Sequence, residues 1–163
     1  EYEYTSMVLL TTNSHLSRLK SLCELVYQND ISGLINGREC FSRLVHKIVE
    51  TFPMEIETDL RIQNVDLHMS VAENLGVIVN ELLTNSVKFA FSMNCENRFR
   101  LEMSYGDHRV HIVVSDNGPG FDSESMKPGL GTELIMASIA NKSERYITRN
   151  HGGAVCEIEY DLG

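Results

Sequence analysis

The sequence predicts an α+β fold, a two-layer α/β sandwich in which amphipathic helices cover one face of a β-sheet. Two observations support this class. Two pairs of segments with alternating apolar residues are each joined by a short turn, at residues 106–108 and 151–153. Elsewhere, apolar residues recur every three or four positions, which is the helical period. With 163 residues, the chain suits one domain, with or without a helical appendage.

The first predicted element is a helix over residues 5–28. Its seam positions alternate spacings of three and four, as in paired helices, and are Leu9, Thr12, Leu16, Leu19, Cys23 and Val26. Such a helix either packs on its own domain or pairs with a partner helix. We favour the partner helix, because a separately complete domain follows this segment.

A second helix is predicted over residues 39–51, after a loop at Asn36-Gly37 and before Pro53. One side of this helix carries its apolar residues, which are Phe41, Leu44, Val45 and Ile48. Residues 55–62 alternate only loosely between apolar and polar, so we expect an edge strand there.

The strongest helical pattern covers residues 70–91, where Ser70 and Glu73 have the spacing of a capping box. Two alternating strands follow, over residues 99–105 and 110–114. A glycine-rich loop over 117–131 then leads into a helix over 131–141, and a hairpin of two strands, 145–148 and 154–160, completes the chain. The order of helices, strand, helix, two strands, helix and two strands completes the predicted sandwich.

Composition narrows the function classes. The formal net charge of −9 argues against a general binder of nucleic acid or anionic membranes, so we expect no nucleic-acid partner. The 4 cysteines lie far apart and form no CxxC pair, and Cys23 and Cys156 sit in apolar patterns typical of buried thiols. We expect a cytoplasmic domain, while a membrane anchor elsewhere in a longer protein stays open.

Polar residues at helical spacing form the first candidate cluster. Glu81, Asn85, Lys88 and Phe89 stand at i, i+4, i+7 and i+8, which places them on one stripe of the helix. Leu82, Leu83 and Val87 are expected to point toward the core instead. The stripe is either a functional surface or a solvated face with an incidental ion pair.

Two further clusters are rich in glycine. Asp116 follows a strand and precedes Gly118 and Gly120, which let the backbone approach a ligand closely or take a positive φ. An aspartate there can accept a hydrogen bond from an exocyclic amine, although the same residues also make an ordinary turn. The third cluster opens a helix, where backbone N–H groups either seat a phosphate or simply form a cap, and consists of Gly129, Leu130, Gly131 and Thr132.

Together, in this order, the three clusters resemble the motifs of the GHKL superfamily. These are the Bergerat-fold ATPases that include histidine kinases, gyrase, heat-shock protein 90 and MutL. Residues 80–89 resemble the N box, 116–121 the G1 box and 129–132 the G2 box. The closest likeness is to histidine kinases whose N box begins Asn-Glu-Leu. The resemblance implies an ATP-binding domain over residues 37–163, preceded over residues 1–36 by the remnant of a dimerisation helix and a linker.

The resemblance implies a role for each site residue. Asn85 corresponds to the asparagine that binds Mg²⁺, Lys88 to the lysine that contacts phosphate, and Phe89 to the ring beside the adenine. Asp116 corresponds to the aspartate that accepts from the adenine amine, and Gly118 and Gly120 to the glycines beside that pocket. The amides of Gly129, Leu130, Gly131 and Thr132 correspond to those that hold the triphosphate. Glu81 stands where ATP-hydrolysing relatives place a general base.

The implied activity is a two-component sensor histidine kinase that uses ATP and Mg²⁺. The γ-phosphate would pass to a histidine on the dimerisation helix of the same or a partner protomer, and then to a response regulator. A homodimer is expected for the full-length protein. His15 lacks the surrounding signature of an acceptor, so we expect the acceptor histidine outside this chain. The alternatives are an anti-sigma serine kinase, an ATPase clamp, and a degenerate kinase that serves as an adaptor.

Overall fold

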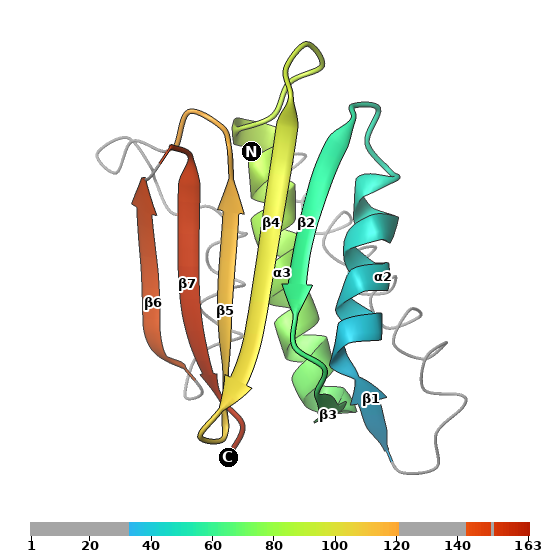
Figure 1. The fold of residues 1–163 in the computed structure, drawn as a ribbon, viewed down its shortest axis with the longest axis vertical. Coiled ribbons are helices and arrows are strands. Elements are labelled where there is room, and N and C mark those ends of the chain that lie inside the picture. Colours follow the sequence, from blue (N-terminus) through green and yellow to red (C-terminus); the bar gives the residue numbers. More distant parts are fainter. Residues whose placement is uncertain (1–32, 121–142, 151) are drawn as a thin grey trace, which may run out of the picture.

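The computed structural model describes residues 33–120, 143–150 and 152–163. Within these residues, five strands form one sheet in the order β2-β4-β5-β7-β6 (Figure 1). Their bounds are Ile56–Ile62 for β2, Asn97–Gly106 for β4, Arg109–Asp116 for β5, Ser143–Asn150 for β6 and Ala154–Asp161 for β7. The helices predicted over residues 5–28 and 131–141 lie outside the described residues.

Both predicted hairpins are confirmed. β4 pairs antiparallel with β5, and β6 pairs antiparallel with β7. In the first hairpin, Asp107 and His108 both have positive φ, at 52° and 58°. Positive φ at both central residues is typical of a type I′ turn, whose twist matches that of the flanking strands.

The remaining strand pairs join these hairpins to the rest of the sheet. β7 also pairs antiparallel with β5, which places the last strand of the chain inside the sheet. β2 lies at an edge, as predicted, and pairs parallel with β4. A parallel neighbour requires a long crossover connection, and a helix provides it here.

Two helices lie on one face of the sheet, which confirms the two-layer sandwich (Figure 1). α2 covers Gly37–Val49 and α3 covers Met69–Phe89, close to the predicted bounds. The core between the layers includes fully buried apolar side chains from the helices and from the central strands, such as Phe41, Leu75, Leu83, Leu101 and Ile158. No helix among the described residues has both the length and the apolar character needed to cross a bilayer.

Two short strands were not predicted. β1, Leu34–Asn36, pairs antiparallel with β3, Asp66–His68, apart from the main sheet. The prediction of a loop at Asn36-Gly37 is therefore wrong, because Gly37 begins α2 and Asn36 ends β1. Asn36 caps the helix instead, and its Oδ1 accepts a hydrogen bond from the backbone N–H of Glu39 at 3.0 Å.

The predicted capping box of α3 is also wrong. The helix begins at Met69, and the residue before it, His68, makes no side-chain hydrogen bond to the first turn. Ser70 therefore lies inside the first turn of the helix, and Glu73 lies beyond it. The start of α3 is held by β3, which directly precedes it, rather than by a hydroxyl cap.

Candidate functional site

Three elements meet at the carboxylate of Asp116, the last residue of β5. The hydroxyl of Ser86 on α3 donates a hydrogen bond to Asp116 Oδ2 at 2.8 Å. The backbone N–H groups of Gly118 and Ala154 both donate to Oδ1, each at 3.1 Å. Hydrogen bonds to a carboxylate are among the stronger ones in proteins, so these donors fix the orientation of Asp116.

The strand period explains why Asp116 faces the helices. Side chains alternate along a strand, and the inward residues of β5 are Val110, Ile112 and Val114, all buried. Asp116 continues this series at the strand end, so its carboxylate points toward α3. Asp116 itself is only partly buried, which leaves its carboxylate open to a ligand.

Two glycines allow the backbone to pack closely around Asp116. A Cβ atom on Gly118 would lie 2.3 Å from the Cβ of Ala90 at the end of α3. A Cβ atom on Gly153, whose φ is +139°, would lie 1.9 Å from the backbone oxygen of Asp116. Gly120 has a φ of 80°, in agreement with the expectation of a positive φ at one of these glycines. The sequence placed Gly153 in the hairpin turn, but its close approach to the backbone of Asp116 was not predicted.

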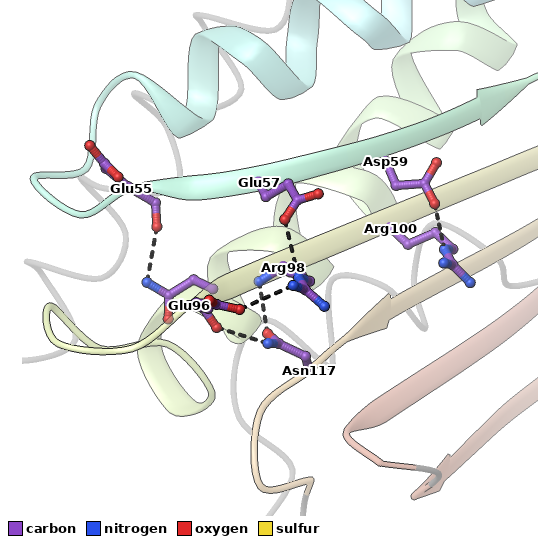
Figure 2. Close-up of polar contacts among 8 residues, drawn as sticks. Glu55, Glu57, Asp59, Glu96, Arg98, Arg100 and Asn117 are labelled. Carbon is purple, nitrogen blue, oxygen red and sulfur yellow. Dashed lines mark hydrogen bonds and ion pairs between the residues drawn. The ribbon is translucent and has the colours of Figure 1, made fainter.

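Asn117 holds the segment that follows Asp116 against the neighbouring strand β4 (Figure 2). Its side-chain Oδ1 accepts from the backbone N–H of Arg98 at 2.7 Å, and its Nδ2 donates to the backbone oxygen of Glu96 at 2.8 Å. A side chain thus continues the hydrogen bonding of the β4–β5 ladder beyond its end. From the sequence, Asn117 was expected only to begin the glycine-rich loop, and this function was not predicted.

The stripe predicted on α3 is present in the structure. Glu81 and Asn85 are partly buried, Lys88 is exposed, and the Phe89 side chain is 68% exposed. The neighbouring residues Leu82, Leu83 and Val87 are buried in the core, as predicted. The stripe therefore lies on the less buried side of the helix, while Ser86 on the same helix contacts Asp116.

Burial raises the pKa of the Glu81 carboxyl. The positive charge of Lys88 and a hydrogen bond from Asn80 Nδ2, at 3.4 Å, oppose this rise without cancelling it. A carboxylate with a raised pKa is a better proton acceptor than an ordinary one. This makes Glu81 chemically suited to orient or deprotonate a nucleophile, although burial alone produces the same shift in structural carboxylates.

The described residues contain no group of three histidine, cysteine or acidic side chains that could bind a metal. An ion at Asn85 would therefore take most of its ligands from elsewhere. An amide oxygen is a suitable ligand for Mg²⁺, which keeps several waters and commonly binds the phosphates of its substrate. Asn85 is compatible with that kind of site.

A hollow of about 770 Å³ lies on the open face of the sheet, away from the helices. Ion pairs between β2 and β4 line it, including Arg98 with Glu57 at 3.1 Å and Arg100 with Asp59 at 2.9 Å (Figure 2). The basic groups there are already paired with carboxylates. Asp116 and Asn117 also line this hollow, but the Asp116 carboxylate points to the other side of the sheet, toward Ser86.

The segment Gly129–Gly131 and Thr132 lies outside the described residues, so its predicted phosphate contacts stay a prediction. The roles assigned to the other site residues are likewise predictions. What the structure brings together is Asp116 with Gly118, and Glu81 with Lys88 on one side of α3.

A family model described as a histidine kinase-like ATPase domain matches residues 55–153. Among solved structures, the Erythrobacter litoralis EL346 blue-light activated histidine kinase has a TM-score of 0.81 at 20% identity, covering 96% of this chain and 56% of that one. The ATP-binding domain of PrrB from Mycobacterium tuberculosis has a TM-score of 0.62 at 17% identity, covering 78% and 95%. At these identities, the structural matches show a shared fold.

Two kinds of curated relative match the sequence. The blue-light-activated histidine kinase 2 of Erythrobacter litoralis is 25% identical over 112 residues, which are 66% of this chain and 32% of the relative. The serine-protein kinase RsbW of Listeria monocytogenes is 37% identical over 59 residues, which are 36% of this chain and 38% of the relative. The match thus spans less than half the length of either relative.

Proposed function

Because this chain belongs to the histidine kinase-like ATPase domain family, we propose that it binds ATP with Mg²⁺ and transfers the γ-phosphate to a histidine of a two-component sensor kinase. The observation that carries the proposal is the Asp116 carboxylate at the end of β5. Donors from α3, the following loop and β7 hold it, and it stays partly open. A fixed acceptor in this position suits the amino group of adenine.

The site residues then have distinct roles. Asp116 accepts a hydrogen bond from the adenine amine, and the exposed ring of Phe89 flanks the base. Lys88 neutralises charge on the phosphates, and Asn85 supplies an amide oxygen to the magnesium ion. The amides of residues 129–132 hold the triphosphate. Mg²⁺, when bound, would shield the negative charge of the phosphate oxygens.

The chemistry is phosphoryl transfer to a nitrogen nucleophile. The bond between the γ-phosphorus and the oxygen that bridges to the β-phosphate breaks, ADP leaves, and a phosphorus–nitrogen bond forms with the histidine. The imidazole proton is lost to a base, and Glu81, with its raised pKa, is suited to accept it. The protein contributes mainly by positioning the reactants and stabilising charge.

The partners follow from this chemistry. The acceptor histidine lies on a dimerisation helix of the same or a partner protomer, in a homodimer, and a response regulator takes the phosphoryl group from it. Support for this part comes from the likeness to histidine kinases over most of the chain. In this account the domain works in the cytoplasm.

A serine kinase of the anti-sigma type is the second candidate. The match to serine-protein kinase RsbW favours it, because identity there is higher, at 37%, although over only 59 residues. The match to the histidine kinase covers 66% of the chain, and for that reason we place the histidine kinase first. The two candidates share the ATP site and differ in the acceptor.

Labelling of the full-length protein with γ-labelled ATP distinguishes the candidates. Phosphohistidine is hydrolysed in acid and survives alkali, whereas phosphoserine survives acid. Acid-labile label on the protein is the expected result. Acid-stable label on an added substrate protein would favour the serine kinase, and a folded protein that binds no ATP would contradict both candidates.

A further inference from the structure

Ser86 is a buried serine on α3 whose hydroxyl leaves its own helix. The residue is 6% exposed, and a hydroxyl at that depth is costly unless it is hydrogen-bonded. Helical serines often bond to a carbonyl of the preceding turn. Here the hydroxyl instead reaches Asp116 Oδ2, 30 residues away in the sequence, at 2.8 Å.

The hydrogen bonds that Asp116 makes within the described residues leave one acceptor position of its carboxylate unused. A carboxylate has about four lone-pair positions, two on each oxygen. Oδ1 accepts from the backbone N–H groups of Gly118 and Ala154, so both of its positions are used. Oδ2 accepts from Ser86, and among the described residues no second donor uses the remaining position on this oxygen.

The same hydrogen bond determines whether the Ser86 hydroxyl can act as a donor or an acceptor toward a ligand. Carboxylate oxygens only accept, so the hydrogen between the two groups comes from the serine hydroxyl. A hydroxyl that has donated its hydrogen presents only lone pairs to other groups. A ligand that approaches Oδ2 therefore meets two acceptors side by side, one from Asp116 and one from Ser86.

We propose that Ser86 is a specificity-determining residue of this site, an inference that rests on the proposed ATP binding. Its oxygen and Asp116 Oδ2 together form a two-acceptor surface. This surface favours a purine with an amino group at ring carbon 6, whose two N–H bonds serve as donors. It disfavours a purine with an oxo group there, because an acceptor would face two acceptors.

The test compares the dissociation constants of ATP and inosine triphosphate, which carries the 6-oxo group, for wild type and Ser86→Ala. The variant removes one acceptor. We expect the preference for ATP over inosine triphosphate to fall by about tenfold, the worth of one hydrogen bond. If Ser86 has a purely structural role, the variant would bind both nucleotides more weakly by the same factor, and the ratio of their dissociation constants would stay unchanged.

Thr84→Val is the matched control. Thr84 is the other buried hydroxyl on this part of α3, and its Oγ1 has no hydrogen-bond partner within the described part of the chain. The valine has nearly the same shape, and we expect the nucleotide ratio to stay at the wild-type value. Melting curves followed by circular dichroism establish that each variant is folded.

The outcomes separate this inference from the function on which it rests. An unchanged ratio in folded Ser86→Ala, with ATP still bound, overturns the inference and leaves the proposed function standing. Wild type that binds neither nucleotide overturns the proposed function as well. Ser86→Cys, which keeps the packing but hydrogen-bonds weakly, gives the same readout if Ser86→Ala does not fold.

Discussion

The two faces of the sheet carry polar contacts of nearly equal length but different environment. On the helix side, Ser86 bonds to Asp116 at 2.8 Å, and the serine is 6% exposed. On the open face, Arg100 pairs with Asp59 at 2.9 Å, with side chains 46% and 41% exposed. Distance alone therefore does not rank these contacts. Water can replace the partner of an exposed group, whereas a buried group that loses its partner remains unsatisfied.

The helix side of the sheet is the better place for a functional site than the open face. On the open face, the two arginines that line the hollow are already paired with carboxylates (Figure 2). On the helix side, three donors fix the Asp116 carboxylate, and within the described residues one of its acceptor positions is unused.

Gly153→Ala is expected to cause the largest loss. The added Cβ would lie 1.9 Å from the Asp116 backbone oxygen, at a φ of +139° that alanine rarely adopts. We expect a loss of about 3 kcal/mol or more in the free energy of unfolding, measured by urea denaturation. Gly152→Ala is the control, since nothing lies within 4 Å of its Cβ and only its φ of +66° is unfavourable. It should cost about 1 kcal/mol. Equal losses would mean that the close contact with Asp116 is unimportant.

Asn85→Ala is expected to remove the part of ATP affinity that depends on Mg²⁺. We expect the dissociation constant for ATP to rise roughly tenfold when Mg²⁺ is present, and to change little when a chelator removes the Mg²⁺. Asn85→Asp keeps an oxygen ligand and should retain the dependence. Calorimetric titrations at several Mg²⁺ concentrations measure both effects. Equal losses with and without Mg²⁺ would rule out a metal ligand at this position.

Glu81→Gln is expected to stabilise the folded protein at pH 7. Burial raises the pKa of Glu81 in the folded state, so folding is disfavoured when the carboxyl must carry its charge. The advantage of the glutamine should shrink as the pH falls through the raised pKa of the folded state, and it should vanish below the ordinary pKa of glutamate, where the carboxyl is neutral in both states. Urea denaturation at several pH values follows this trend. Glu55→Gln, on the exposed loop before β2, is the control. An advantage that grows toward low pH would contradict the account.

Arg100→Gln on the open face should have the smallest effect. Its partners Asp59 and Glu102 are themselves exposed and paired with Arg61. We expect the melting temperature to stay within about 1 °C of wild type. A large drop would show that the open face is energetically comparable to the helix side, and would break the comparison.

Short-range sequence patterns correctly predicted the hairpin between β4 and β5 and the polar stripe on α3. The turn at Gly106-Asp107-His108 and the alternation around it defined the hairpin, and the stripe on α3 followed from spacing alone. The three-residue strands β1 and β3 were missed because they are too short to show a period. The capping box at Ser70 failed because α3 begins one residue earlier, at Met69, directly after β3 and without a side-chain cap.

The site was predicted only in part, for a related reason. Asp116 was found because it ends a strand within a glycine motif. Ser86 contacts Asp116 across 30 residues, and Asn117 contacts Arg98 across 19. Gly153 likewise approaches the backbone of Asp116 from a distant turn. The spacing of residues along the sequence does not encode such contacts. The signal that could have found Ser86 is a serine in the midst of the buried residues of a helix, where a hydroxyl needs a partner.

Parallel calorimetric titration of wild type and Asp116→Ala with ATP shows whether the Asp116 carboxylate holds adenine. If Asp116 is the acceptor that holds adenine, wild type binds ATP saturably and the variant, with its fold intact by circular dichroism, loses at least about a hundredfold in affinity. Equal ATP affinity in the two folded proteins would contradict the assignment of the site.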